Sequence, residues 1–186
     1  MPINLTKGQR IDIGLSRVGV GLGWDPNSVS GHDFDLDASC FLLGSSGKLP
    51  SDQHFVFYNN PLSPDKAVES SGDDRTGGSS DGDDETLTVD LNQVEPQVQE
   101  MIFAVSIHEF DARRQNFGQV RNSFIRIYDA LTNSEIAKYE LDEDFSIESA
   151  VEFGRLYRRG GLWKFEAIGR GYAGGLQTLV DKYYQH

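Results

Sequence analysis

The residues best suited to chemistry in this chain are acidic, and they fall into three groups. Trp24-Asp25 follows a strand-like sequence, Asp33-Phe34-Asp35-Leu36-Asp37 alternates carboxylates with apolar side chains, and Gly72–Glu85 is a glycine-rich acidic segment. In an extended chain, alternation places the last two carboxylates of the second group on one side. The glycines of the third group allow the chain to turn back, so that several oxygens can meet. Oxygens in this arrangement are ligands for a hard cation.

Carboxylates that converge need a compensating charge. Two like charges about 4 Å apart repel by roughly 4 kcal/mol at an effective dielectric constant near 20. Calcium accepts about 6–8 oxygen ligands in adaptable geometry, whereas magnesium requires a stricter octahedron and retains its waters. Zinc prefers cysteine and histidine, and the chain has one cysteine and four histidines. The three acidic groups therefore favour calcium.

A charge-rich loop is also typical of a surface segment that water alone solvates, and composition leaves that alternative open. An EF-hand is excluded as the form of the site. In a loop starting at Asp33, Ala38 stands where the EF-hand glycine belongs, and Gly44 stands where its bidentate glutamate belongs. A calcium site in this chain must therefore be assembled from separate loops.

The elements that position these residues are mostly strands. Short stretches with period-two alternation are separated by clusters of Gly, Asn, Asp, Pro and Ser. Val18–Trp24 alternates apolar residues with glycines, so another group can approach the glycine face closely. Met101–Ile107 is an almost continuous apolar run, which indicates a strand covered on both sides. Val151–Tyr157 and Leu162–Tyr172 flank a turn-forming sequence and predict a hairpin.

Two segments favour helix. The apolar side chains of Leu176–Tyr184 repeat with helical spacing after two glycines, and Pro96–Glu100 is compatible with a single helical turn. The sum predicts an all-β fold, an antiparallel β-sandwich with a C-terminal helix and long acidic loops. We expect residues 1–186 to form one domain.

The net charge of −12 restricts the partners and the location. Thirteen acidic and three basic residues lie between Asp25 and Glu85, which leaves sixteen acidic and fourteen basic residues elsewhere. Such a surface repels nucleic acid. No apolar run reaches the roughly 20 residues of a membrane span, so we expect no direct membrane insertion. Cys40 is the only cysteine. Together with an N-terminus unlike a secretion signal, this predicts a cytoplasmic protein.

Several ordered blocks resemble the tellurium-resistance TerD family, which is also described as calcium-binding stress proteins. In chain order, the matching blocks are Val20-Gly21-Leu22-Gly23-Trp24-Asp25, Phe34-Asp35-Leu36-Asp37-Ala38-Ser39, Phe57-Tyr58-Asn59, Gly72-Asp73-Asp74-Arg75-Thr76-Gly77, Gly82-Asp83-Asp84-Glu85, Ile107-His108, Arg113–Val120, Trp163-Lys164-Phe165 and Gly174-Gly175-Leu176. They cover nearly the whole chain. The resemblance implies a β-sandwich that binds calcium through acidic loops and contributes to resistance to tellurite and other stresses.

The resemblance also implies a set of metal ligands. Carried over residue by residue, the expected ligands are Asp25, Asp35, Asp37, Asp73, Asp83, Asp84 and Glu85, followed by Asn59 and Asp74. Asp74 stands where the family pattern has asparagine, and the loop between Gly77 and Gly82 is one residue longer than the usual form. We expect more than one calcium ion.

Residues 108–121 carry further polar groups that each have two interpretations. Glu109 can add a ligand oxygen or can simply end a strand. The basic residues Arg113, Arg114 and Arg121 form either a solvated face or a contact for an acidic partner or for a second copy of this protein.

The expected function is a calcium-dependent binding module that changes its affinity for other stress-system proteins, and we expect no enzymatic activity. Two alternatives stay open. One is a passive scaffold whose acidic loops are merely solvated. The other is a metal-dependent phosphohydrolase, because Asp35-Leu36-Asp37-Ala38-Ser39 superficially resembles a haloacid-dehalogenase motif. That motif normally ends a buried parallel strand, whereas the predicted strand follows it here.

Overall fold

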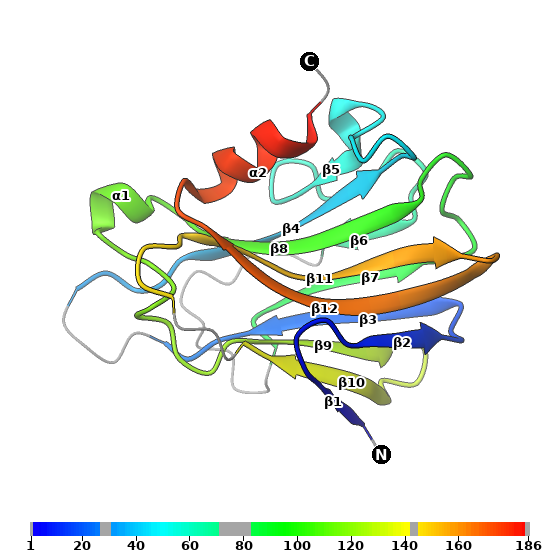
Figure 1. Cartoon of the computed structure of the whole chain (residues 1–186), viewed down its shortest axis with the longest axis horizontal. Helices are drawn as coiled ribbons and strands as arrows, with labels where there is room; N and C mark the ends of the chain where they lie inside the picture. Colours follow the sequence, from blue (N-terminus) through cyan, green and yellow to red (C-terminus); the bar gives the residue numbers. More distant parts are fainter. Residues whose placement is uncertain (1, 27–30, 71–82, 142–144, 185–186) are drawn as a thin grey trace.

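Two six-stranded β-sheets face each other in the computed structural model, which describes residues 2–26, 31–70, 83–141 and 145–184 (Figure 1). The strands of sheet A are, in spatial order, β1 (Ile3–Leu5), β10 (Glu135–Glu140), β9 (Phe124–Asp129), β3 (Arg17–Gly23), β7 (Glu85–Asp90) and β6 (Val68–Ser70). Those of sheet B are β2 (Arg10–Ile13), β12 (Leu162–Tyr172), β11 (Ala150–Arg159), β8 (Glu100–Ile107), β4 (Leu36–Leu43) and β5 (Phe55–Val56). The predicted β-sandwich is confirmed.

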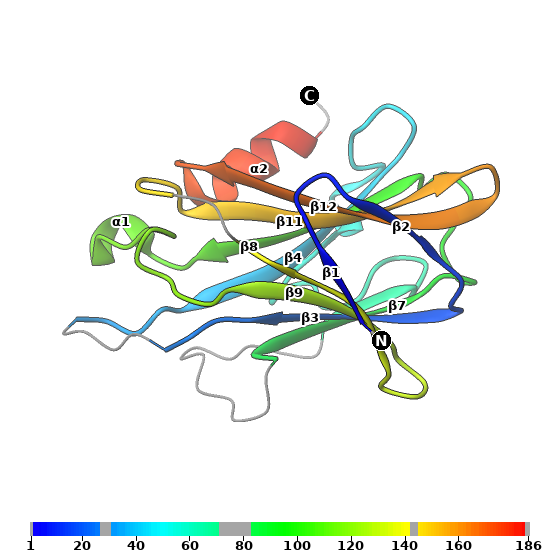
Figure 2. The same ribbon diagram turned by 60° about the horizontal axis from the view of Figure 1, so that its bottom comes forward.

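One strand pair departs from the predicted antiparallel arrangement. β1 runs parallel to β10, with Ile3 opposite Ala137. The chain then turns at Thr6–Gln9 and enters β2 at the edge of sheet B. The N-terminal segment thus crosses from one sheet to the other along one side of the sandwich (Figure 2). A segment that crosses in this way can pair with its neighbour in either direction. The alternation of three residues therefore could not predict the parallel pairing of β1 with β10.

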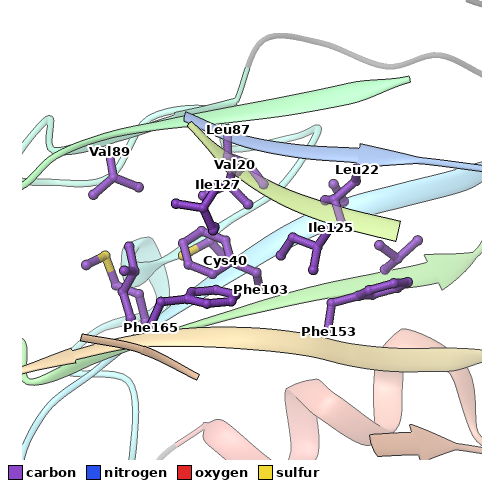
Figure 3. Close-up of a cluster of buried hydrophobic side chains, with 14 of the residues drawn as sticks. Val20, Leu22, Cys40, Leu87, Val89, Phe103, Ile125, Ile127, Phe153 and Phe165 are labelled. Atoms are coloured by element: carbon purple, nitrogen blue, oxygen red, sulfur yellow. The ribbon is translucent and has the colours of Figure 1, made fainter. Parts of the chain in front are cut away.

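Apolar side chains from both sheets interdigitate between the layers. Figure 3 shows side chains of β3, β7 and β9, such as Leu22 and Ile125, facing those of β8, β11 and β12, such as Phe103 and Phe153. The contributing residues alternate along each strand of sheet A, because its other face is turned away from the core. This core fixes the register of the strand ends that carry the acidic residues.

A second apolar cluster covers the outer face of sheet B. Helix α2 (Gly175–Tyr183) lies over this face (Figures 1 and 2). Its Leu179 and Tyr183 belong to the same buried cluster as Phe41 of β4 and Ile102 of β8. Both faces of these strands are therefore buried, which explains their unbroken apolar sequences. The predicted C-terminal helix and the predicted hairpin, which is β11–β12, are both confirmed.

Two short segments differ from the sequence interpretation. Pro96 and Gln97 form a turn and β8 already begins at Glu100, so the predicted helical turn is absent there. A one-turn helix, α1 (Phe110–Arg113), was not predicted, since four residues are too short to show helical periodicity. A short 3₁₀ helix, η1 (Asp52–His54), precedes β5. None of the helices in the described ranges is long and apolar enough to cross a membrane.

Candidate functional site

The expected ligands that the structure describes gather mainly at one end of the sandwich. At this end β3 and β8 finish and β4 and β7 begin, as the pairing of Leu22 with Glu85 and of Leu36 with Ile107 shows. Helix α1 lies at the same end (Figure 1). We call this region the acidic end and define it by Asp25, Asp35, Asp37, Asp83, Asp84 and Glu85. Because the sheets fix the strand ends, segments far apart in sequence meet there.

Asp35 and Asp37 lie against the segment that contains α1. Their side chains are only 13% and 11% exposed. The backbone carbonyl of Asp35 accepts a hydrogen bond of 2.7 Å from the backbone N–H of His108. Arg113 Nη1 stands 3.9 Å from Asp35 Oδ2, and His108 Nδ1 stands 3.9 Å from Asp37 Oδ2. Arg113 therefore faces a carboxylate of its own chain. The sequence had left open whether this residue is solvated or contacts an acidic partner.

Asp84 and Glu85 fasten the start of β7 to its neighbours. Asp84 Oδ2 accepts a 2.8 Å hydrogen bond from the backbone N–H of Trp24. Glu85, which is 5% exposed, turns into the space between the sheets, and its Oε2 accepts a hydrogen bond from the backbone N–H of Ala38 on β4. This bond places the Glu85 carboxylate one residue away from Asp37 along β4.

Asp83 lies on the outer face of sheet A. Its two oxygens accept hydrogen bonds of 2.8 and 2.9 Å from Arg126 Nε, and its Oδ2 is 2.7 Å from Arg126 Nη2. The carboxylate covers Gly21, where a Cβ atom would stand 2.4 Å from Oδ2. The hydrogen bond with Asp83 raises the pKa of Arg126 above its ordinary value. The open glycine face predicted for β3 is thus occupied by this pair and, over Gly19, by the ring of Tyr128.

The remaining expected ligands are more scattered. Asp25 is exposed, and its Oδ2 accepts a 2.7 Å hydrogen bond from Asn122 Nδ2. Asn59 is exposed in the turn that joins Phe57 to Asn60. Asp73 and Asp74 lie outside the described residues. The structure therefore places Asp35 and Asp37 at the start of β4 and Asp84 and Glu85 at the start of β7, at the same end of the sandwich, and turns Asp83 toward Arg126.

The donors at the acidic end match a hard cation in type. In the part of the chain that is described, no three His, Cys, Asp or Glu side chains form a ready metal cluster. Oxygen atoms nevertheless dominate the acidic end, with His108 as the nearby nitrogen donor. Gln115, which the sequence interpretation did not single out, adds a buried amide whose Oε1 finds no donor among the described residues. Carboxylate, amide and carbonyl oxygens are the donors that calcium prefers.

The phosphohydrolase motif has the wrong surroundings. Asp35 and Asp37 stand at the start of β4, which pairs antiparallel with both of its neighbours, β8 and β5. In haloacid-dehalogenase phosphohydrolases this motif follows a parallel strand. The antiparallel surroundings of Asp35 and Asp37 therefore do not reproduce the catalytic geometry of those enzymes.

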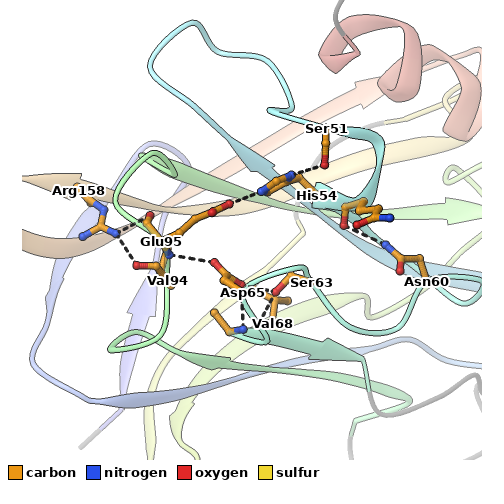
Figure 4. Close-up of polar contacts among 11 residues, drawn as sticks. Ser51, His54, Asn60, Ser63, Asp65, Val68, Val94, Glu95 and Arg158 are labelled. Atoms are coloured by element: carbon orange, nitrogen blue, oxygen red, sulfur yellow. Dashed lines mark hydrogen bonds and ion pairs between the residues drawn. The ribbon is translucent and has the colours of Figure 1, made fainter.

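A second polar network closes the opposite end of the sandwich (Figure 4). Buried His54 joins Ser51 Oγ, 2.8 Å from its Nδ1, to the carboxylate of Glu95 at its Nε2. The backbone N–H of Glu95 donates to Asp65, and Arg158 donates to the carbonyl oxygens of Val94, Glu95 and Val98. Because its members tie η1 and the β5–β6 connection to the β7–β8 connection, we assign this network a structural role.

Comparisons with known proteins agree with the fold and with the blocks of sequence. The chain is 49% identical to the tellurium resistance protein TerD of Serratia marcescens over 188 residues, which cover 98% of this chain and 97% of that protein. It is also 49% identical to general stress protein 16U of Bacillus subtilis over 189 residues, covering 98% and 97%. The crystal structure of a homologue of the telluride resistance protein TerD from Streptomyces coelicolor A3(2) superposes with a TM-score of 0.71 at 23% identity, covering 92% of this chain and all of that one, which supports the fold.

The match to the family itself spans almost the whole sequence. The TerD domain matches residues 1–183, which include all the strands and α-helices of the described ranges and all six residues of the acidic end. The chain therefore belongs to the TerD domain family of tellurium-resistance and stress-response proteins.

Proposed function

We propose that the protein is a calcium-binding stress-response protein that acts, without enzymatic activity, as a calcium-dependent interaction module in the cytoplasm. The observation that supports the proposal is that Asp35 and Asp37 at the start of β4 lie at the same end of the sandwich as Asp84 and Glu85 at the start of β7, where Glu85 accepts a hydrogen bond from Ala38 of β4. These four carboxylates come from two segments almost fifty residues apart. We expect more than one calcium ion, with Asp25, Asn59, Asp73 and Asp74 as further donors. Other proteins of the stress system are the expected partners.

The concentration of carboxylates supports a divalent cation at this place. Asp35 stands 3.9 Å from the guanidinium of Arg113 and Asp83 is paired with Arg126 on the outer face, while Asp37, Asp84 and Glu85 add three further carboxylates to the same end. The side chains of Asp35 and Asp37 are about nine-tenths buried, so water screens them poorly. A doubly charged ion lowers the repulsion among carboxylates that share one end of the sandwich. Calcium suits the mixture of carboxylate, amide and carbonyl oxygens better than magnesium does.

The proposed role in binding partners rests on the position of the carboxylates in segments that connect strands. The acidic residues belong to segments that join strands, and an ion shared by two such segments holds them in one arrangement. A partner that recognises this arrangement binds more tightly when calcium is present, because the ion and the partner favour the same state. The names of the relatives support a role in stress resistance.

Thermal unfolding with and without calcium tests the proposal. An ion that binds only the folded protein adds about 2.7 kcal/mol at 100 times its Kd, which corresponds to a rise in Tm on the order of 5 to 10 °C for a chain of this size. Chelation reverses the rise, and magnesium at the same concentration gives a smaller one. We expect the double variant Asp35→Asn, Asp37→Asn to lose the response.

The matched control removes the same two charges at exposed positions away from the acidic end. Asp12→Asn combined with Asp52→Asn should retain the full calcium response, since neither residue belongs to the acidic end. A wild-type Tm that is identical in calcium and in chelator would favour the passive scaffold, whose acidic loops are only solvated.

A further inference from the structure

Gln115 lies outside the expected ligand set, yet its amide contacts the stretch of chain that leads into Asp35 and Asp37. The side chain is buried, with the residue 6% exposed. Its Nε2 donates to the backbone carbonyl of His32 at 2.8 Å and to that of Asp33 at 3.3 Å. Carbonyl oxygens only accept hydrogen bonds, so the nitrogen of the amide must face them. This contact fixes which way the amide is turned and leaves its oxygen in the interior.

The oxygen of this amide finds no donor within the described residues. Gln115 Oε1 is fully buried and makes no hydrogen bond there. Buried polar atoms in folded proteins are nearly always paired, because an unpaired acceptor has lost its water without compensation. A group outside the described residues must therefore meet this oxygen. A cation or an ordered water can do so.

The surroundings of Gln115 favour a cation over a water molecule. Gln115 follows α1, and the α1 segment also carries His108 and Arg113, which face the carboxylates of Asp37 and Asp35. The amide of Gln115 therefore lies on the same contact, between residues 32–37 and the α1 segment, that also includes both low-exposure carboxylates. A neutral amide oxygen is a usual calcium ligand, and it adds coordination without adding to the repulsion between carboxylates.

We propose that Gln115 is a further calcium ligand, which gives Oε1 to the ion held by Asp35 and Asp37 while its Nε2 positions the backbone of His32 and Asp33. The assignment rests on the proposed calcium function and adds a residue to the expected donors. It also assigns a role to α1, because the segment that follows this helix provides one of the oxygen ligands of the ion.

Two substitutions separate ligation from a merely structural role. Gln115→Met removes both the oxygen and the amide nitrogen at similar length, whereas Gln115→Glu retains an oxygen but loses the nitrogen donor. Both variants lose the hydrogen bonds to His32 and Asp33 and are therefore less stable without calcium. Gln119→Met is the matched control, because Gln119 is exposed and lies four residues away.

Calcium titration by calorimetry on the full chain is the measurement. We expect Gln115→Met to weaken calcium binding on the order of 10- to 100-fold, while Gln119→Met leaves the affinity unchanged. Gln115→Glu should bind within a fewfold of the wild type, or more tightly. Unchanged affinity in Gln115→Met, or equal weakening in the Met and Glu variants, overturns the ligand assignment and leaves only a positioning role.

The wild-type protein provides a second measurement that does not depend on whether the variants fold. Calcium bound to Oε1 shifts the ¹³C signal of the Gln115 side-chain carbonyl by more than that of Gln119 in NMR spectra. A Gln115 signal that does not move at saturating calcium overturns the assignment while the calcium function stands. A wild-type protein that releases or absorbs no heat on titration overturns the proposed function itself.

Discussion

Glu85 of β7 accepts a hydrogen bond from the backbone N–H of Ala38 of β4 and thereby links the two sheets at the acidic end. The pairing of β4 with β5 covers only Cys40 and Phe41, so the N–H of Ala38 lies beyond the last partner on that side. A carboxylate from the opposite sheet takes the place of a strand neighbour. Glu85 is therefore part of the fold whether or not it also binds an ion.

Replacing Glu85 with alanine should destabilise the protein in the absence of calcium. The change leaves the buried N–H of Ala38 without its acceptor, which costs about 1–3 kcal/mol. Glu85→Gln keeps a side-chain carbonyl oxygen at the same distance from the backbone and should therefore lower the stability less than Glu85→Ala does. Urea unfolding in the presence of a chelator measures both. Glu69→Ala, at an exposed position of β6, should stay within about 0.5 kcal/mol of the wild type. Equal stability of Glu85→Ala and the wild type would contradict the link.

The sequence predicted the elements that have a clear period or turn signal. The alternation of Val18–Trp24, the turn between β11 and β12 and the helical stripe of α2 each reflect a local rule, and all three elements are present. β1 and α1 have three and four residues, too few for a period to show. The parallel pairing of β1 depends on how the chain crosses between the sheets, which no local pattern records.

The acidic end was only partly predictable for a similar reason. Alternation around Leu36 correctly placed Asp35 and Asp37 on the side away from the core. The sequence could not show that Asp83 turns toward Arg126, because the partner is 43 residues away and belongs to another strand. Gln115 carries no charge and follows no metal motif, so only its burial and its hydrogen bonds draw attention to it.

The pair formed by Asp83 and Arg126 should contribute measurably to stability. The two side chains are 12% and 21% exposed and bind through two nitrogens of the guanidinium. Hydrogen bonds between charged groups are worth about 1.5–3 kcal/mol when buried, and partial exposure reduces this value. A double-mutant cycle with Asp83→Asn and Arg126→Met should give a coupling of about 1 kcal/mol.

A second cycle calibrates the first. Lys138 and Glu140 are 31% and 76% exposed and stand 3.3 Å apart, so their coupling should lie between about 0 and 0.5 kcal/mol. Both cycles use urea unfolding in chelator. If the cycle of Asp83 and Arg126 gave no more coupling than this exposed pair, the two side chains would not hold each other in solution.

A row of charges on the outer face of sheet B predicts a pH dependence. Glu166 of β12 accepts hydrogen bonds from Arg155 at 2.7 Å and from Arg10 at 2.9 Å, and Arg155 also binds Glu100. Burial acts to raise the pKa of Glu166, but the hydrogen bonds from the two arginines outweigh burial and hold the pKa below its ordinary value of 4.5. The stabilisation is therefore present above pH 4.5 and is lost as the pH falls through the lower, folded-state pKa.

Arg155→Met should raise the pKa of Glu166, because only Arg10 then remains to oppose the effect of burial on this pKa. The variant should lose stability near neutral pH and show a weaker fall in Tm between about pH 5 and pH 3. A ¹³C NMR titration of the Glu166 carboxyl group reports the pKa directly. Lys138→Met, which breaks an exposed pair on the other sheet, should leave this titration unchanged. A Glu166 pKa that is the same in Arg155→Met and the wild type would refute the explanation.

Arg113 should oppose calcium at the acidic end. Its guanidinium stands 3.9 Å from Asp35 Oδ2, where it already compensates part of the negative charge. A divalent ion beside Asp35 is repelled by this guanidinium and must displace it or bind next to it. Removing the positive charge therefore increases the repulsion between carboxylates when the acidic end holds no ion. It also removes the repulsion between the guanidinium and the ion when calcium is bound. Both changes increase the affinity for calcium.

Arg113→Met tests this expectation while retaining most of the side-chain length. We expect the calcium affinity to rise several-fold in calorimetric titrations, with a larger rise at low ionic strength, because salt screens the charge that is removed. Without calcium the same variant should be slightly less stable than the wild type, since the ion pairs of Arg113 with Asp35 and Glu109 are lost. Arg159→Met is the control, because it makes the same change in net charge at the far end of β11. Equal gains in the two variants would show that only the overall charge matters, and weaker binding in Arg113→Met would mean that Arg113 helps to hold Asp35 in place for the ion.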